Sequence, residues 1–207
     1  LKNYGRAIKQ ELDKHPDKKR IALITTEYDS TLKRTAAVRE LVKEKSLIVF
    51  DETISSIAEI PGVTVKLIAK KPQVIVINLL PGQVGIFSKK IREYNLDVLL
   101  IGPDSIAEKS ELELAQGSLD NALYIDSDLD PDFLSRYEND YQEYPPNRFA
   151  HGYDAVHILA NAYRLSGFKK DKKIINTLIR VKNFSGALGQ FSIAEDNSNC
   201  FDLKATV

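Results

Sequence analysis

The sequence predicts an α/β protein built on a doubly wound, mainly parallel sheet of five strands, with extra helices and a short β-like tail at the C-terminal end. Five short aliphatic runs are continuous rather than alternating, as strands covered by helices on both faces should be. The residues that follow the runs stand at positions 25, 51, 78, 102 and 126, so the spacing is 26, 27, 24 and 24 residues. This spacing accommodates one helix and two loops, which is a repeating βα unit. The runs are 21–24, 47–50, 74–77, 98–101 and 122–125.

The segments between the runs have helical patterns. Apolar residues recur at i, i+3 and i+4 in the first and third segments, which predicts amphipathic helices. Ser30 or Thr31 is the expected N-cap of the first helix. The segment 55–70 is also expected to be helical, although Pro61 and Gly62 interrupt it. The residues that carry the spacing are Val38, Leu41 and Val42 in the first segment and Val84, Phe87, Ile91 and Tyr94 in the third.

Beyond residue 126 the repeating pattern ends. An acidic turn follows, in which Asp130 or Asp132 is suited to cap the next helix. Pro145 and Pro146 stop that helix and are the best candidate for a boundary between lobes. Two further helices follow, the first ending at Gly167, and the tail from 186 to 207 has a β-like pattern with glycines.

Composition and charge exclude several classes of protein. The 207 residues include 29 Lys and Arg against 29 Asp and Glu, so no overall field favours nucleic acid or an anionic membrane. No apolar run approaches the length of a membrane span. The chain has one cysteine, Cys200, and carries neither a dinucleotide-binding nor a P-loop glycine motif. We therefore expect no metal, no nucleotide cofactor and no nucleic-acid partner.

Three residues on one predicted helix resemble a metal-ligand set at first sight. His151, Asp154 and His157 are spaced at i, i+3 and i+6, so His151 and Asp154 share a face while His157 points away. Two ligands from one helix are too few for a metal site. Solvated or hydrogen-bonded helix residues are the favoured interpretation.

The candidate binding residues lie where the strands end, because open α/β sheets bind ligands beyond the carboxyl ends of their strands. Asp104 follows the fourth strand, and a carboxylate there can accept hydrogen bonds from a ligand ammonium group. The alternative, of about equal weight, is that Asp104 caps a helix after the turn at Gly102 and Pro103. The other residues on this rim are Thr25, Thr26, Glu27, Tyr28, Asn78, Leu79 and Leu80.

The ordered motifs of the chain resemble the type 1 periplasmic binding proteins of the leucine/isoleucine/valine-binding kind. The similarity runs through nearly all of the sequence, and its most specific part is the pair of motifs near the C-terminal end. These motifs are "KKRIALITTEYDSTLKRTAAVRELVKE", "KPQVIVINLLPGQVGIFSKKIREYNLDVLLIGPDS", "AQGSLDNALYI", "FLSRYENDYQEYPPNRFAHGYDAVHILANAYRLSG" and "FSGALGQFSIAEDN".

The resemblance implies a non-enzymatic solute-binding component of an ABC transporter, in which two α/β lobes close around a small molecule. Residues 1–144 would form most of a C-terminal ligand-binding lobe, 145–190 helices that belong with the N-terminal lobe, and 191–207 a return strand and tail. The implied ligands are branched-chain or other amino acids or small amides, and the implied partner is a membrane ABC permease. The implied location is periplasmic or extracytoplasmic, with or without a lipid anchor on the precursor. A ligand-sensing regulator or receptor domain on the same fold is the alternative.

The resemblance also assigns roles to residues of the rim. Asp104 would bind the ligand amino group, Leu79 or Leu80 would stand where relatives often have an aromatic wall, and Tyr28 would be a further aromatic contact. The first hundred or so residues of relatives have no counterpart, and that part carries contacts to the ligand carboxylate, so we expect the chain to be incomplete for tight binding. We also expect the apolar stripes of 150–182, with Tyr153, Val156 and Tyr163, to fold back on the lobe or to be buried in a homodimer.

Overall fold

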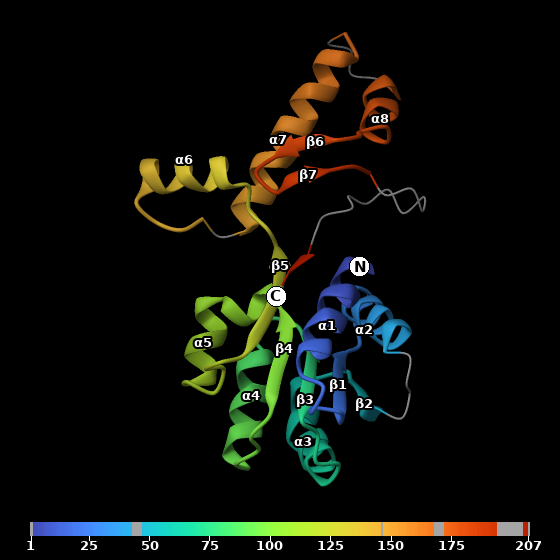
Figure 1. Cartoon of the computed structure of the whole chain (residues 1–207), viewed down its shortest axis with the longest axis vertical. Helices are drawn as coiled ribbons and strands as arrows, with labels where there is room; N and C mark the ends of the chain where they lie inside the picture. The colour runs from blue at the N-terminus through green and yellow to red at the C-terminus, as the bar shows by residue number, and fades with distance from the viewer. Residues whose placement is uncertain (1, 43–46, 146, 168–171, 194–204, 207) are drawn as a thin grey trace. The chain divides into compact units, whose positions relative to one another are not determined.

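The computed structural model describes residues 2–42, 47–145, 147–167, 172–193 and 205–206. These residues form two compact units (Figure 1), one from the described residues up to 126 and the other from the described residues from 127 onward. Each unit has its own hydrophobic core. None of the helices formed by the described residues is long and apolar enough to cross a membrane.

The first unit is built on the predicted parallel sheet. Its five strands lie in the order β2-β1-β3-β4-β5, and each pairs with its neighbours in parallel. Every residue of β1 and of β3 is buried, which explains why these sequence runs are continuous rather than alternating. The prediction of five parallel strands is therefore confirmed. The strands are β1 (Ile21–Thr26), β2 (Ile48–Ile54), β3 (Val74–Asn78), β4 (Leu99–Pro103) and β5 (Leu123–Ser127). The short strand β8 (Ala205–Thr206) belongs by residue number to the second unit.

Helices cover both faces of this sheet. The chain passes from β1 outward to β2 and then back across β1 to β3, so right-handed crossovers place the second and third helices on opposite faces. The contacts agree, because α1 packs on α2, while α4 packs on α3 and α5. The helices are α1 (Lys2–Lys14), α2 (Asp29–Leu41), α3 (Ile60–Ala69), α4 (Val84–Glu93) and α5 (Lys109–Ala115), with short 3₁₀ helices η2 (Ile57–Glu59) and η3 (Asp104–Ala107).

The predicted helix in 55–70 is confirmed, but the predicted N-cap of α2 is wrong. Tyr28 occupies the N-cap position, without a side-chain cap. The Thr31 hydroxyl instead donates to the carbonyl oxygens of Thr26 and Tyr28, at 2.6 and 2.7 Å. Thr31 lies inside the first turn because the helix begins at Asp29, two or three residues earlier than the sequence pattern indicated. Its hydroxyl stabilises the loop after β1 rather than the free amides of the helix.

The second unit combines three helices with a β-hairpin. The Asp130 carboxylate accepts from the backbone N–H groups of Asp132 and Phe133, so Asp130 is the helix cap that the acidic turn predicted. Gly167, with φ of +72°, follows the long central helix as predicted. The elements are α6 (Pro131–Tyr141), α7 (Asn147–Leu165), α8 (Lys172–Leu178), β6 (Phe184–Gly186) and β7 (Gly189–Phe191).

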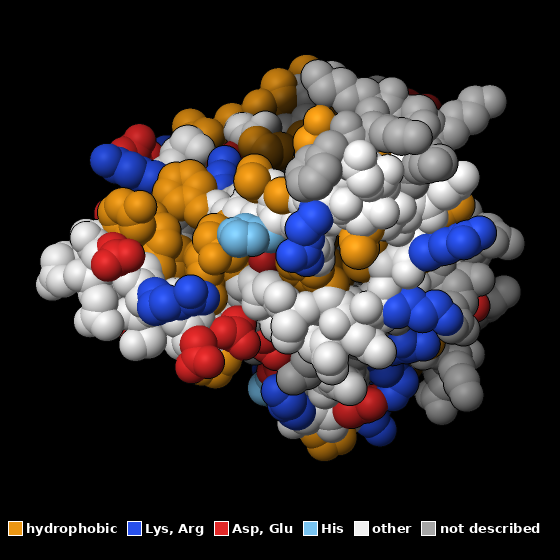
Figure 2. All heavy atoms as spheres, turned by 90° about the horizontal axis from the view of Figure 1, so that it is seen from above, with side chains coloured by type: hydrophobic (Ala, Val, Ile, Leu, Met, Phe, Trp, Pro, Cys, Tyr) orange, Lys and Arg blue, Asp and Glu red, His pale blue; other side chains and the backbone are white. Residues whose placement is uncertain are grey.

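An apolar face of α7 is exposed in the structure. Val156 is 66% exposed and Tyr153 is 39% exposed, and both belong to the stripe that the sequence pattern identified. Figure 2 shows hydrophobic side chains at the surface of one face of the molecule, beside basic and acidic ones. Burial of this face of α7 in a homodimer stays a prediction. The domain boundary at 144 and 145 likewise stays a prediction, since it concerns lobes of longer proteins.

Candidate functional site

The candidate site lies at the carboxyl ends of β1 and β3. The chain leaves β1 toward one edge of the sheet and leaves β3 toward the other. The helices that follow these two adjacent strands, α2 and α4, therefore lie on opposite faces of the sheet. The loop 27–28 follows β1, which ends at Thr26, and the loop 79–83 follows β3. The space between diverging helices at such a reversal is where doubly wound sheets hold their ligands.

A buried hydrogen-bond network fixes the ends of both strands from within. The Tyr4 hydroxyl on α1 donates to Asn78 Oδ1 at 2.7 Å. Asn78 Nδ2 in turn donates to Thr35 Oγ1 at 2.9 Å, and Thr35 Oγ1 lies 2.7 Å from Thr25 Oγ1. Asn78 is completely buried, so this candidate rim residue is engaged inside the fold. Its position suits a residue that holds the edge in place.

Tyr4, the member of this network that comes from α1, is buried. Burial raises its pKa well above the ordinary value of 10.0, the Arg34 cation lowers it in part, and the Asp104 carboxylate raises it. The phenol therefore remains protonated at neutral pH and continues to donate to Asn78. Both charged side chains lie close enough to Tyr4 to affect its titration.

A second network joins the two loops directly. The side-chain oxygen of Gln83 accepts from the Thr26 hydroxyl and from the backbone N–H of Leu80, the latter at 3.1 Å. The buried Glu111 carboxylate accepts from the backbone N–H groups of Gly82 and Gly85, the latter at 2.7 Å, and so holds the first turn of α4. Gln83 thus bridges loops that are 57 residues apart in sequence.

The remaining candidates differ in exposure. Tyr28 is 56% exposed beside the edge, and Glu27 is exposed with its carboxylate accepting from the Ser55 hydroxyl at 2.7 Å. Leu80 is partly buried, whereas Leu79 belongs to the hydrophobic core of the unit. Of the two leucines, Leu80 is therefore the one accessible to a bound molecule.

Asp104 is exposed and begins η3 directly after β4. The N-cap of η3 is Pro103, so the structure does not show Asp104 as the helix cap that the sequence left as an alternative. Among the described residues, no side chain or backbone group hydrogen-bonds to its carboxylate. Asp104 thus presents acceptor oxygens to the solvent at the edge of the sheet.

Sequence reasoning placed Thr26 on the rim but missed three residues that shape this edge, which are Tyr4, Arg34 and Gln83. Tyr4 and Arg34 come from α1 and α2, and the guanidinium carbon of Arg34 lies 5.5 Å from the centroid of the Tyr4 ring. Thr26 and Gln83 form the bridge between the loops. The sequence did show polar residues, Thr25 and Thr26, at the end of a buried strand, which indicates that their hydroxyls need hydrogen-bond partners. Nothing in the sequence indicated that these partners are Thr35 and Gln83.

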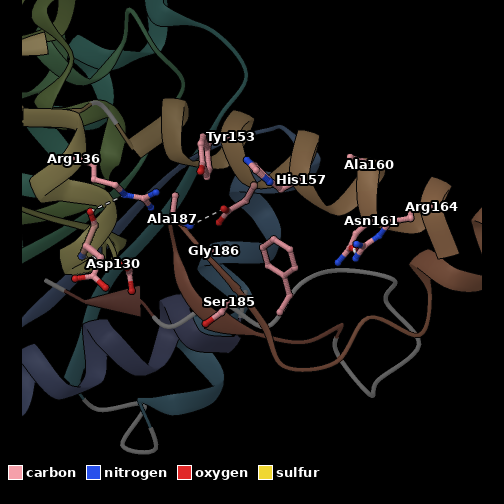
Figure 3. A pocket seen from close by; sticks show the side chains of 13 residues that line it. Asp130, Arg136, Tyr153, His157, Ala160, Asn161, Arg164, Ser185, Gly186 and Ala187 are labelled. Carbon is pink, nitrogen blue, oxygen red and sulfur yellow. Dashed lines mark hydrogen bonds between the residues drawn. The ribbon is translucent and has the colours of Figure 1, made fainter. Parts of the chain in front are cut away.

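A separate hollow of about 640 Å³ lies in the second unit, between α7 and the hairpin (Figure 3). Arg136, Tyr153, His157 and Asn161 are among the residues that line it. The buried carboxylate beside it, Asp154, is already engaged by the hairpin, because it accepts from the backbone N–H groups of Ala187 and Leu188. The side chain that seemed a possible ligand thus stabilises the fold.

The metal hypothesis for this helix gains no support. His151 and His157 are exposed, whereas Asp154 is buried. Within the part of the chain that the structure describes, no three His, Cys, Asp or Glu side chains are grouped so that they could hold a metal ion. The ring of His157 instead contacts that of Tyr153, with centroids 4.4 Å apart.

The comparison with protein families identifies the chain. The periplasmic binding protein family matches residues 2–203, so the chain belongs to this family. The resemblance to type 1 members seen in the motifs is thereby confirmed. A comparison with curated proteins gives no significant match.

Three solved structures show the same fold. The leucine binding protein LivK from Thermotoga maritima is 18% identical with a TM-score of 0.78, and 96% of this chain covers 63% of it. The branched-chain amino acid transporter substrate binding protein LivJ from Streptococcus pneumoniae, in complex with isoleucine, is 24% identical with a TM-score of 0.75, over 93% of this chain and 57% of that one. A solute binding protein of an ABC transporter from R. palustris, in complex with benzoate, is 20% identical with a TM-score of 0.73, over 94% and 56%. The chain thus spans less than two thirds of the length of these proteins.

Proposed function

We propose that the chain provides one ligand-binding lobe of an extracytoplasmic solute-binding component of an ABC transporter, with a branched-chain or other amino acid, or a small amide, as ligand. The observation that carries the proposal is the edge at β1 and β3, where an exposed carboxylate and an exposed tyrosine stand on a frame fixed by buried hydrogen bonds. A prearranged edge of this kind binds a ligand at a lower entropic cost, because its loops are ordered beforehand.

The residues at the edge suit binding better than catalysis. Asp104 offers an acceptor for an ammonium group, and Leu80 and Tyr28 offer apolar surface to a side chain. The polar groups beneath them are engaged in hydrogen bonds with one another, so they are positioned to support the edge rather than to activate a nucleophile. Family membership also supports a binding function, because the chain belongs to the periplasmic binding proteins and the similar structures described above are of solute-binding proteins.

The experiment is a thermal-shift screen of the chain with amino acids, small amides, aromatic acids and sugars. A ligand that binds only the folded state raises the melting temperature, and the stabilisation grows with the logarithm of its concentration once that exceeds Kd. We expect leucine, isoleucine or another small amino acid to raise it at millimolar concentration, and sugars to have no effect. Turnover of a test ester or phosphate, with no stabilisation by any amino acid or amide, would overturn the proposal.

The partner in this proposal is the membrane permease of the transporter, and the location is outside the cytoplasm. The support is the family and the fact that the similar structures include substrate-binding proteins of ABC and branched-chain amino acid transporters. Uptake by permease vesicles that depends on the added binding protein would test the partnership. A regulator or receptor domain would bind the same ligand without promoting uptake.

A further inference from the structure

Glu111 on α5 is a buried carboxylate without a cation beside it. The residue is completely buried, and within the described part of the chain no Lys, Arg or His side chain forms an ion pair with it. Its oxygens instead accept from the backbone N–H groups of Gly82 and Gly85, the latter at 2.7 Å. A buried charge loses its hydration, so it adds little net stability and is better suited to fixing one arrangement of the backbone.

The two amides that Glu111 holds lie in and directly after the loop that follows β3. Gly82 belongs to loop 79–83 and has a φ of +85°, whereas Gly85 lies in the first turn of α4. Gly85 allows α4 and α5 to approach closely, because an added Cβ there would collide with the backbone oxygen of Glu111. The absence of a side chain at Gly85 therefore lets the carboxylate reach the loop.

Loop 79–83 is also held from the side of β1. The side-chain oxygen of Gln83 accepts from the hydroxyl of Thr26, at the end of β1, and from the backbone N–H of Leu80. Leu79 is packed into the hydrophobic core, and Leu80 remains partly buried at the edge. The conformation that presents Leu80 is thus fixed by Gln83 toward β1 and by Glu111 toward α5.

Glu111 belongs to the same segment of chain as Asp104. Asp104 begins η3, and α5 follows η3 after one residue. The 3₁₀ helix η3 packs on both α4 and α5, and its Ile106 lies in the same hydrophobic core as Leu79. The segments that follow β3 and β4 are therefore packed together, and Glu111 supplies hydrogen bonds from one to the other.

We propose that Glu111 is a positioning residue of the ligand-binding edge: it holds loop 79–83 so that Leu80 meets the side chain of an apolar amino acid bound by Asp104. The inference rests on the proposed function and extends it to a residue that does not touch the ligand. Without this hold the loop would adopt its binding conformation for only a fraction of the time, and the apparent affinity would fall by that fraction. A carboxylate that only stabilised the fold would leave the affinity of the folded chain unchanged.

The first test is Glu111→Gln, which retains the shape of the side chain but has one acceptor oxygen in place of two. The measurements are hydrogen exchange and a titration with leucine, both followed by NMR in the intact chain. We expect the amides of Leu80 and Gly82 to exchange about tenfold faster in the free variant, while amides at the centre of β3 change little. Leucine should bind about tenfold more weakly, and at saturation it should restore the protection of both amides.

Glu113→Gln is the matched control for the loss of a carboxylate. Glu113 is exposed on the same helix, two residues beyond Glu111. Its substitution should leave both the exchange of the Leu80 amide and the affinity for leucine unchanged. A melting temperature for each variant reports whether the fold is intact.

Gly82→Ala tests the loop while the buried carboxylate stays in place. Gly82 has open space around it, so the fold accommodates the methyl group, but its positive φ is unfavourable for alanine and disfavours the present loop conformation. This variant should weaken leucine binding as Glu111→Gln does. Gly62→Ala is its control, since Gly62 lies in α3 with open space around it and should not affect binding.

The outcomes separate this inference from the function on which it rests. If leucine binds Glu111→Gln and Gly82→Ala as tightly as it binds the unsubstituted chain, the edge binds the ligand and Glu111 does not position it. A lower melting temperature of Glu111→Gln with unchanged affinity would likewise mean that Glu111 only stabilises the fold. If leucine does not bind the unsubstituted chain, this inference fails, and the proposed function fails as well if no amino acid or amide of the thermal-shift screen binds.

Discussion

Asp154 on α7 holds two consecutive backbone amides of a hairpin that lies 33 residues further along the chain. Its Oδ1 accepts from Ala187 N at 2.6 Å and its Oδ2 from Leu188 N at 2.9 Å. An added Cβ on Gly186 would stand only 2.2 Å from Asp154 Oδ1. The "GYDA" and "FSGALG" motifs, the more specific part of the family resemblance, are thus two halves of one contact. The first motif supplies the buried carboxylate of Asp154. The second supplies Gly186, which has no Cβ and so lets the hairpin backbone approach that carboxylate.

Gly186→Ala should destabilise the second unit by about 1–3 kcal/mol, because the new methyl group displaces the Asp154 carboxylate from the hairpin amides. Chemical unfolding and hydrogen exchange of Ala187 and Leu188 measure the effect. Gly152→Ala is the matched control: Gly152 lies in α7 with open space around it, so alanine there should be neutral or stabilise the helix by up to about 1 kcal/mol. Equal stability of the two variants would refute this account of the motif.

Gln83→Met should loosen the loops after β1 and β3, because it removes the oxygen that accepts from Thr26 and Leu80. The loss of these hydrogen bonds should cost about 1–3 kcal/mol locally. The amide of Leu80 should exchange faster with solvent, while amides at the centre of β3 change little. Gln83→Glu retains an acceptor oxygen and should behave like the unsubstituted chain. Unchanged exchange at Leu80 in the methionine variant would show that the bridge contributes nothing.

Asp104→Asn should weaken binding of an amino acid by about tenfold or more, because the ammonium group of the ligand loses a charged acceptor. The melting temperature should hardly change, since Asp104 is exposed and Pro103, not Asp104, is the N-cap of η3. Asp120→Asn provides the control, because Asp120 is exposed just before β5, at the opposite end of the strands. Calorimetry on the three proteins decides the matter, and equal affinities would mean that other groups hold the ligand.

Tyr4→Phe should reveal the buried phenol through the pH dependence of stability. The pKa of Tyr4 is raised in the folded state chiefly by burial, whereas in the unfolded state it is near the ordinary value of 10.0. Below that pH both states are protonated, so the stability that the tyrosine contributes is fully present. Above it the unfolded state loses the proton first, and this stability is lost as the pH rises toward the folded pKa.

The free energies of unfolding of the two proteins should therefore differ by a constant amount at neutral pH and converge as the solution becomes strongly alkaline. At neutral pH the variant should be less stable by about 1–3 kcal/mol, because Asn78 Oδ1 loses its buried donor. Urea unfolding at a series of pH values provides the measurement. Parallel profiles up to the most alkaline pH would contradict the raised pKa.

Val156→Glu should reduce self-association without destabilising the chain, if the exposed face of α7 is a surface of contact between two copies. Val156 is 66% exposed, and substitutions at such surface positions usually change stability by about 0.5 kcal/mol or less. Val65→Glu, at a 55% exposed position on α3, is the control and should leave association unchanged. Sedimentation at several concentrations measures the effect. A monomer at every concentration in the unsubstituted chain would rule out the homodimer.

The sequence by itself determined the five parallel strands, their spacing and the helices between them. Periodicity and β-branched runs are local signals that report burial on two faces, and burial is what the sheet of a doubly wound fold imposes on β1 and β3. The sequence also placed Asp104, Tyr28 and the leucine pair at strand ends, because the end of a buried run is visible in the pattern itself.

Only the tertiary structure decided which of these residues support the edge and which are exposed on it. Asn78 and Tyr28 were both placed at strand ends from the sequence. In the structure Asn78 is completely buried, with hydrogen bonds to side chains from α1 and α2, whereas Tyr28 is 56% exposed. The partners in that network are 43 and 74 residues distant from Asn78 in the chain, and a hydrogen bond leaves no periodic trace in sequence. For the same reason Arg34 and Gln83 could not be found from the pattern: their roles depend on which side chain meets them after the helices pack on the sheet.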